Sequence, residues 1–210
     1  MAEKTLPEIR QFVVGPIETN CYALVSDGHA VVVDPGAAGA RIAQELGDVT
    51  VDAVIATHGH GDHVGGVKGL VDALPYDVPF WIHEADAARA SRAGTPGNLG
   101  IAYDDDAPAP ARHLHDGDRI DVGDVSMRVI ETPGHTPGGV VLLGDGFAFT
   151  GDTLFAGSAG RTDFPEGDHA TLMASLRRLM QEVPPETVVL PGHNAVTTME
   201  RELATNPFLQ

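Results

Sequence analysis

Residues 58–63 read His-Gly-His-Gly-Asp-His, which places three imidazoles and one carboxylate within a six-residue span. The preceding residues 51–56 are apolar in the manner of a buried strand, and residues 64–74 repeat apolar side chains at helical spacing. The run is therefore expected on a loop between a strand and a helix. Gly59 and Gly61 alternate with the polar residues and let the chain fold closely around an ion. The fold of this chain must therefore place these four polar side chains, on one loop, at a metal site.

The chemistry of this run suits zinc, iron or manganese, because imidazole and carboxylate are present and thiolate is absent. A structural zinc site is usually rich in cysteine, whereas this chain has a single cysteine, Cys21, far from the run. We expect His58 and His60 to point one way, and Asp62 and His63 another. The run thus predicts half-sites for two ions rather than one closed four-ligand site.

Three further side chains that can bind a metal follow strand-like stretches ending at residues 130, 150 and 190; they are His135, Asp152 and His193. A single histidine or aspartate on a turn is more often solvated or capping. Loops at strand ends, however, commonly gather at one edge of a sheet and build a site there. Because all three residues follow strands, we expect them to complete the metal site.

The remaining pattern predicts alternating strands and helices, and hence mixed sheets covered by helices. Strands are expected at residues 9–14, 21–26 and 29–33. Helices are expected at residues 38–46, 64–74, 84–92 and 169–183. The last helix should carry Leu172, Leu176, Leu179 and Met180 on one face. Residues 95–111 lack periodicity and are rich in turn residues, so they should form an exposed loop.

The composition limits the partners of this chain. Its 210 residues are enough for one well-packed domain, expected over residues 1–210. The net charge of −17 argues against nucleic acid, which requires a basic face. Neither a signal-peptide pattern nor a run of apolar residues long enough to span a bilayer is found, which predicts a soluble, cytoplasmic protein that does not bind membranes. The oligomeric state is not predicted.

The spaced ligands resemble those of the metallo-β-lactamase-fold hydrolases, and the resemblance covers nearly the whole chain. It implies an α+β fold, an αββα sandwich of two mixed β-sheets flanked by helices. It also implies two divalent metal ions, most often zinc, with iron or manganese as alternatives. The implied ligands are His58, His60 and His135 for one ion, Asp62, His63 and His193 for the other, and Asp152 as the bridge.

Within that family the chain is most similar to the glyoxalase II group, the hydroxyacylglutathione hydrolases and their short bacterial relatives. The motifs that carry this similarity lie at residues 19–22, 33–36, 132–138, 151–155 and 206–209. Long members of the group continue into a helical extension with basic residues for glutathione, which is expected to be absent here. True β-lactamases fit less well, because they lack a bridging carboxylate at the position of Asp152.

The implied reaction is hydrolysis of a small thioester. Two ions that share Asp152 can hold a bridging water as hydroxide near neutral pH and polarise a carbonyl. Asp62 and Asp152 are accordingly the expected catalytic residues, Asp62 by orienting the hydroxide. A thiol with a pKa of about 8.5 leaves without a dedicated acid, and none is evident among the motif residues.

Alternatives remain open at this point. The segment at residues 160–164 is also similar to that of persulfide dioxygenases of this fold, which use one iron, here implied to be held by His58, His135 and Asp152. A lactone hydrolase and a non-enzymatic metal-binding scaffold rank lower. Arg161 either binds a substrate carboxylate or pairs with a neighbouring acidic group such as Asp163. Tyr103 is the residue of the 95–111 loop expected to meet substrate.

One residue outside these motifs can support the site. Asp34 follows an apolar strand, and it either orients a ligand imidazole or caps its own turn. The other histidines are expected to be ordinary surface or core residues; they include His83, His113, His115 and His169.

Overall fold

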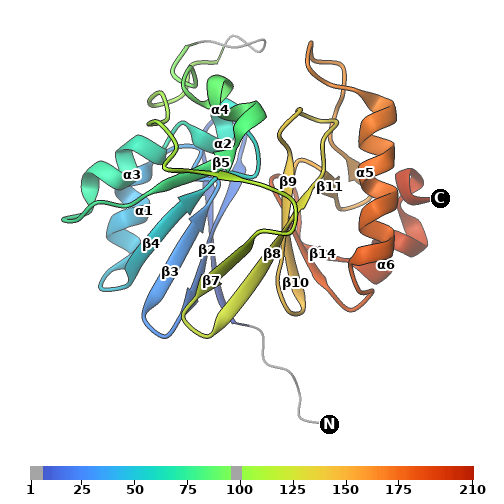
Figure 1. The fold of residues 1–210 in the computed structure, drawn as a ribbon, viewed down its shortest axis with the longest axis horizontal. Coiled ribbons are helices and arrows are strands. Elements are labelled where there is room, and N and C mark those ends of the chain that lie inside the picture. The colour runs from blue at the N-terminus through green and yellow to red at the C-terminus, as the bar shows by residue number, and fades with distance from the viewer. Residues whose placement is uncertain (1–6, 96–100) are drawn as a thin grey trace.

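The computed structural model describes residues 7–95 and 101–210, and within them two six-stranded sheets pack face to face between outer helices (Figure 1). The predicted αββα sandwich of two mixed sheets is therefore confirmed. Figure 1 shows α1 and α3 on the outer side of one sheet and α5 and α6 on the outer side of the other.

The first sheet has the strand order β1-β2-β3-β4-β5-β6. Its strands are β1 (Glu8–Val14), β2 (Thr19–Ser26), β3 (His29–Val33), β4 (Thr50–Ile55), β5 (Phe80–His83) and β6 (Arg112–Leu114). The first three strands are antiparallel, and β3 to β6 are parallel. The tight turn between β2 and β3 has positive φ at both Asp27 and Gly28, the geometry of two-residue hairpins.

The second sheet has the order β14-β13-β10-β9-β8-β7. Its strands are β7 (Arg119–Val122), β8 (Val125–Glu131), β9 (Val140–Leu143), β10 (Phe147–Gly151), β13 (Val188–Pro191) and β14 (Thr197–Thr198). β10 is parallel to β13, and because β9 is antiparallel to both β8 and β10, β8 also runs in that direction. The carboxyl ends of β8, β10 and β13 therefore lie at one edge of the sheet.

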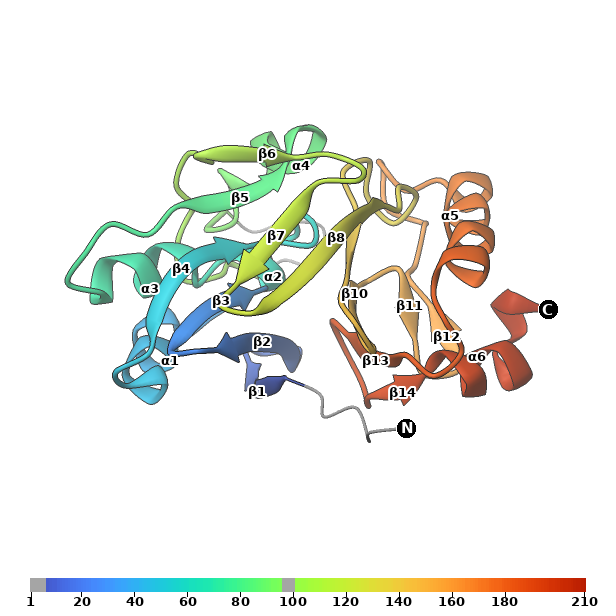
Figure 2. The same ribbon diagram turned by 60° about the horizontal axis from the view of Figure 1, so that its bottom comes forward.

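The helices flank the sheets, and a small hairpin lies beside the second sheet (Figure 2). The helices are α1 (Gly39–Leu46), α2 (Gly61–Val64), α3 (Val67–Ala73), α4 (Glu84–Ala90), α5 (His169–Glu182), α6 (Met199–Thr205) and the 3-10 turn η1 (Pro207–Leu209). The hairpin consists of β11 (Leu154–Phe155) and β12 (Ser158–Ala159). In the described part of the chain no helix combines the length and the apolar character that crossing a membrane requires.

Both faces of each sheet are covered, and side chains alternate between two cores. On β2, Cys21 and Ala23 pack toward the outer helices, whereas Tyr22 and Leu24 pack between the sheets. The layer between the sheets is closed from the other side by aromatic residues of β10, including Phe149, whose ring centroid lies 5.3 Å from that of Tyr22. This alternation is what the two-residue period of a strand produces when both faces are buried.

The helix predicted at residues 64–74 is wrong as a single element, because α2 and α3 are separated at Gly65 and Gly66. The backbone N–H of Gly66 donates to the carbonyl of Pro35 at 2.8 Å, and a Cβ on Gly66 would lie 2.7 Å from that oxygen. This close approach interrupts the helix.

One smaller expectation is wrong, and another agrees with the structure over the described residues. Met180 on α5 is exposed, whereas Leu172, Leu176 and Leu179 are buried as predicted. The described part of the 95–111 loop contains no helix or strand, and a hydrogen bond from the backbone N–H of Ala38 to Asp104 at 2.8 Å fixes its position. Residues 96–100 of that loop lie outside the described part of the chain.

Candidate metal centre

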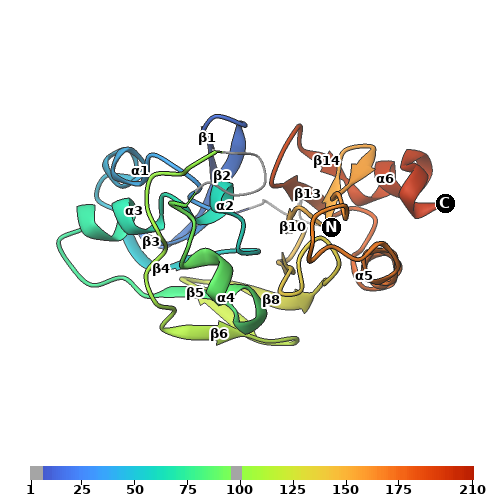
Figure 3. The ribbon, with the colours of Figure 1, turned by 90° about the horizontal axis from the view of Figure 1, so that it is seen from above.

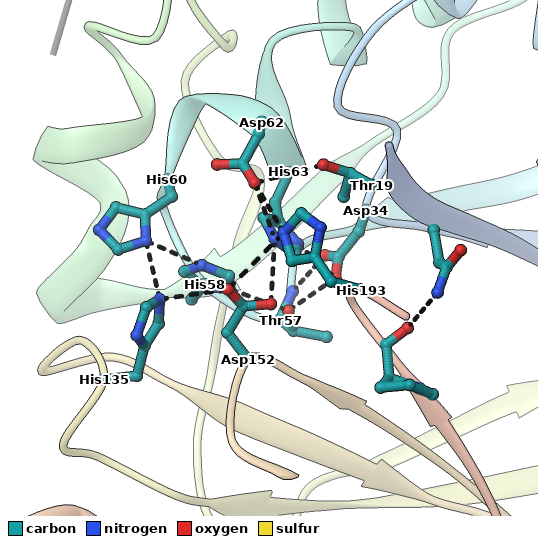
Figure 4. Close-up of polar contacts among 12 residues, drawn as sticks. Thr19, Asp34, Thr57, His58, His60, Asp62, His63, His135, Asp152 and His193 are labelled. Carbon is teal, nitrogen blue, oxygen red and sulfur yellow. Dashed lines mark hydrogen bonds and ion pairs between the residues drawn. The ribbon is translucent and has the colours of Figure 1, made fainter. Parts of the chain in front are cut away.

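The seven predicted ligands come together at the carboxyl ends of four strands, between the two sheets (Figure 4). In the view from above, α2 of the first half of the chain faces β10 and β13 of the second sheet (Figure 3). The run at residues 58–63 follows β4, and the other three ligands follow β8, β10 and β13. Three overlapping groups have ligand atoms within 4.8 Å of one another: His58, His60 and His135; His58, His63 and Asp152; and Asp62, His63 and His193.

In the first group three ring nitrogens face one point. His60 Nδ1 lies 3.0 Å from His58 Nε2 and 2.9 Å from His135 Nε2. The proton of His135 is held on the far nitrogen, because Nδ1 donates to the carbonyl of Arg161 at 2.7 Å. His58 Nδ1 similarly donates to Thr57 Oγ1 at 3.2 Å. The lone pairs of His58 and His135 are therefore directed inward, as in metal-binding histidines.

The group of Asp62, His63 and His193, called the second group from here on, joins the helix α2 to the loop after β13. Asp62 Oδ2 lies 3.1 Å from His193 Nε2 and 3.3 Å from His63 Nε2. The Thr19 hydroxyl of β2 donates to the same carboxylate oxygen at 3.2 Å. The two imidazoles and this carboxylate thus face a common point beside the first group.

Asp152 lies between the two groups, as Figure 4 shows. Its Oδ1 is 3.3 Å from His63 Nε2, and its Oδ2 is 3.5 Å from His135 Nε2 and 3.8 Å from His193 Nε2. Together, the two oxygens of Asp152 therefore lie close to ligand atoms of both groups. A bridging ligand requires this position.

The buried side chains at the junction of the two groups fit a divalent cation. His63 Nε2 and Asp152 Oδ1 are buried and make no hydrogen bond, although buried polar atoms are normally paired. Three carboxylates, those of Asp34, Asp62 and Asp152, surround the fully buried ring of His63. A buried imidazole nitrogen and a buried carboxylate oxygen that lie 3.3 Å apart without a hydrogen bond are the expected surroundings of a divalent ion.

The pKa values agree with this interpretation. Burial lowers the pKa of His58 well below its usual value and that of His60 to about 3, so both rings are neutral at pH 7, as metal ligands must be. Burial acts in the same direction on His63, but the carboxylates of Asp62 and Asp152 outweigh it and raise the pKa of His63.

Asp34 supports the ligands rather than only capping its own turn. Its Oδ1 accepts from the backbone N–H of Thr57 at 2.7 Å, and its Oδ2 accepts from the Thr57 hydroxyl at 2.7 Å and from His63 Nδ1 at 2.9 Å. Because the Thr57 hydroxyl donates to Asp34, it can only accept from His58. One buried carboxylate thus orients His63 directly and His58 through Thr57.

The loop that carries His193 is held by β2. Asn20 Nδ2 donates to the carbonyls of Pro191 and Asn194, both at 3.0 Å, and the Tyr22 hydroxyl donates to Pro191 at 3.0 Å. These residues belong to the motif at residues 19–22, so the motif has a structural role at the second group of ligands.

A cavity of about 760 Å³ opens beside the ligands, and both predicted substrate residues, Tyr103 and Arg161, line it. Arg161 also pairs with Asp163 at 2.6 Å, and its guanidinium lies 4.3 Å from the ring centre of Phe164. Burial raises the pKa of Tyr103 to about 12, so its hydroxyl stays protonated.

Arg89 and Arg92, which also line the cavity from α4 and the residues after it, were not predicted from the sequence. The helix itself was predicted, but its apolar pattern does not say which face meets a cavity. None of the four histidines set aside in the sequence belongs to a ligand group in the described residues; they are His83, His113, His115 and His169.

A family model of the metallo-beta-lactamase superfamily matches residues 14–193, and the chain therefore belongs to that superfamily. Hydroxyacylglutathione hydrolase GloC of Haemophilus influenzae is 33% identical over 210 residues, covering 93% of this chain and 95% of the relative. A hydroxyacylglutathione hydrolase of Xanthomonas axonopodis pv. citri is 39% identical over 175 residues, covering 82% of this chain and 59% of the relative.

Solved structures agree on the fold. The B3 metallo-beta-lactamase BLEG-1 is 32% identical with a TM-score of 0.88, covering 97% of this chain and 100% of its own. TTHA1623 in a di-iron-bound form is 36% identical with a TM-score of 0.86, covering 95% and 100%. ETHE1 from Myxococcus xanthus is 27% identical with a TM-score of 0.76, covering 95% and 83%. The names of these proteins differ, so family membership alone does not identify the substrate.

Proposed function

We propose that this protein is a dinuclear metal-dependent hydrolase of a small thioester. The observation that carries the proposal is the position of Asp152, whose two oxygens lie within 3.8 Å of ligand atoms in both groups. In this proposal one ion is held by His58, His60 and His135, and the other by Asp62, His63 and His193. Zinc is the metal that we favour, although the di-iron form of TTHA1623 makes iron a real alternative.

The chain's own residues prepare the site for hydrolysis. When bound, two divalent ions supply a water of lowered pKa and polarise the substrate carbonyl. Asp152 holds both half-sites in one geometry, and Asp62 is placed by Thr19 so that its second oxygen is available to accept a proton from water. A thiolate leaves without protonation by an acid, which agrees with the absence of an uncommitted acid among the described ligand residues.

The cavity suits a small substrate that carries a carboxylate. Arg89, Arg92 and Arg161 line it, and Glu166 is the one acidic residue among its lining that is not a proposed ligand. Arg89 pairs with Glu166 at 3.1 Å and Arg161 pairs with Asp163 at 2.6 Å, so the three guanidinium groups exceed these two carboxylates by one. In a chain with a net charge of −17, this local excess of positive charge favours an anionic substrate over a neutral one. Tyr103, which remains protonated, can donate a hydrogen bond to it.

The proposal is supported by relatives named as hydroxyacylglutathione hydrolases, one of which matches along almost its whole length. The direct test is hydrolysis of S-lactoylglutathione by zinc-loaded protein, followed as loss of the thioester absorbance. A chelated sample and Asp152→Asn are the controls, and both should lose turnover. No turnover by the loaded protein, or hydrolysis of a β-lactam but not of the thioester, would contradict the proposed substrate class.

The second candidate is a mononuclear-iron persulfide dioxygenase. It is favoured by the distance of 3.5 Å between His135 Nε2 and Asp152 Oδ2, and by His58, which shares one group of close ligand atoms with His135 and another with Asp152. Oxygen uptake with glutathione persulfide by iron-loaded protein would identify it, since hydrolysis consumes no oxygen. A lactone hydrolase would instead cleave small lactones faster than thioesters, and a metal-binding scaffold would do neither.

A further inference from the structure

One carboxylate outside the ligand set joins two of the loops that carry ligands. Asp86 on α4 is fully buried. Its Oδ2 accepts from the backbone N–H of Gly59 at 2.7 Å, and its Oδ1 accepts from the backbone N–H of Gly138 at 2.9 Å. Gly59 lies between His58 and His60, and Gly138 follows His135 by three residues. Both oxygens of Asp86 are thus committed to the loops of the first ligand group.

The two glycines leave the space that Asp86 fills. A Cβ on Gly59 would lie 2.6 Å from the Asp86 carbonyl oxygen, and a Cβ on Gly138 would lie 2.9 Å from the Asp86 carboxylate. Gly59 and Gly138 do not belong to the glycines that have a positive φ. Their lack of a side chain is therefore required by the close approach of Asp86, and not by an unusual backbone conformation.

The second ligand group has different supports. His63 is held by Asp34, and the loop of His193 is held by Asn20 and Tyr22. Asp86 makes no hydrogen bond to any of these in the described residues. A change at Asp86 should consequently affect one half of the centre more than the other.

We propose that Asp86 is a positioning residue that sets the distance between the His58–His60 loop and the His135 loop, and so determines the affinity of the first half-site. The inference rests on the proposed two-ion centre. Asp86 does not touch substrate or ions; it acts through the backbone of two loops. It also places α4, which carries Arg89 on the cavity wall, in a fixed relation to the first half-site.

The test measures metal affinity rather than turnover. In Asp86→Asn, one oxygen remains an acceptor, but the NH₂ group faces a backbone N–H that can no longer be paired. Cobalt(II) is titrated into metal-free wild type and variant, with the visible absorption of each site and a competing chelator giving two affinities. We expect one of the two affinities to fall by about 10- to 100-fold, the range found for residues that orient metal ligands, and the other to stay within about threefold.

The chain offers a matched control in Glu202, another fully buried carboxylate. It accepts from the Gly157 backbone N–H at 2.7 Å and from the Thr197 hydroxyl at 2.7 Å, and it makes no bond to the loops of the first ligand group in the described residues. Glu202→Gln should bind both ions as the wild type does. Gly138→Ala is the second variant, and it serves if Asp86→Asn does not fold. Its methyl group would displace the Asp86 side chain without changing the carboxylate, so it should also weaken one ion selectively.

The outcomes separate this inference from the proposed function. Wild-type affinity at both sites in Asp86→Asn, or an equal loss at both sites, would overturn the positioning role. A selective loss in a protein that hydrolyses no thioester would keep the role and reject the substrate. If the wild type binds a single ion, the two-ion proposal fails, and the role of Asp86 is then decided by whether Asp86→Asn, and not Glu202→Gln, weakens that ion.

Discussion

Asp34 connects both halves of the metal centre through one carboxylate. It has positive φ, 55°, a conformation that aspartate tolerates better than most residues, and this conformation turns its side chain toward Thr57 and His63. Asp86, by contrast, touches the loops of the first half only. The two carboxylates therefore have separable effects on metal binding.

Asp34→Asn should weaken both ions. The amide keeps one oxygen. At the position of Oδ2 this oxygen leaves the NH₂ group facing the Thr57 backbone N–H, and at the position of Oδ1 the bonds from the Thr57 hydroxyl and from His63 are both lost. We expect about a 10- to 100-fold loss of affinity at each site in the same cobalt titration. A loss confined to one site would contradict the shared role of Asp34.

Asn20 and Tyr22 give a graded test of the loop that carries His193. Tyr22→Phe removes one bond to the Pro191 carbonyl, which keeps its bond from Asn20, so the free energy of unfolding should fall by only about 0.5–1 kcal/mol. Asn20→Ala removes the bonds to the carbonyls of both Pro191 and Asn194, and it should lower the free energy of unfolding by about 1–3 kcal/mol. Urea unfolding of metal-free protein measures both, and a larger cost for Tyr22→Phe would reject this account.

At the scale of elements, the sequence predicted most strands and helices but not the contacts between distant segments. The apolar run before residue 58 and the strand-like stretches before the later ligands were sufficient to place each ligand at a strand end. The break between α2 and α3 depends on Pro35, which approaches from another part of the chain. The roles of Asp86 and Arg89 likewise depend on which face of α4 meets the site, and periodicity does not contain that information.

Helix α5 is fastened to the second sheet by Arg178. Its guanidinium donates to Asp116 at 2.9 Å, to Glu182 at 2.6 Å and to the Glu131 carbonyl at 3.3 Å. These bonds to Arg178 lower the pKa of both Asp116 and Glu182. Groups with a lowered pKa in the folded state stabilise it above their unfolded pKa, and this contribution is lost as pH falls through the folded pKa.

Arg178→Ala should therefore destabilise the protein at pH 7 by about 1 kcal/mol or less, because the side chains are partly exposed and screened by solvent. The difference from wild type should shrink below about pH 4, where both carboxylates become protonated. This difference in stability is measured by the midpoints of urea unfolding of the metal-free wild type and variant, at pH 7 and at successively lower pH. A difference that is independent of pH would show that the arginine acts only through packing.

At the scale of the whole molecule, the proposed metal centre joins the two sheets. The proposed ligands at residues 58–63 extend from the first sheet, and His135, Asp152 and His193 extend from the second. The sequence predicted that these seven residues lie together, since their spacing resembles a known family. Of their supports it indicated only Asp34, because Asp86, Asn20 and Tyr22 act through backbone groups far away in the chain.

Metal removal should consequently loosen the contact between the sheets. An ion at 100 times its dissociation constant stabilises the folded state by about 2.7 kcal/mol. We expect chelation to lower the melting temperature of the wild type, and to leave that of the double variant His135→Ala/His193→Ala nearly unchanged. Equal melting temperatures of loaded and chelated wild type would contradict a centre that binds across the sheets.

The most direct test of the two-ion centre is anomalous X-ray diffraction from crystals of zinc-loaded protein at the zinc absorption edge. The account predicts two peaks, one among His58, His60 and His135 and one among Asp62, His63 and His193, with Asp152 between them. A single peak would contradict the dinuclear centre and would favour a mononuclear enzyme of the same fold.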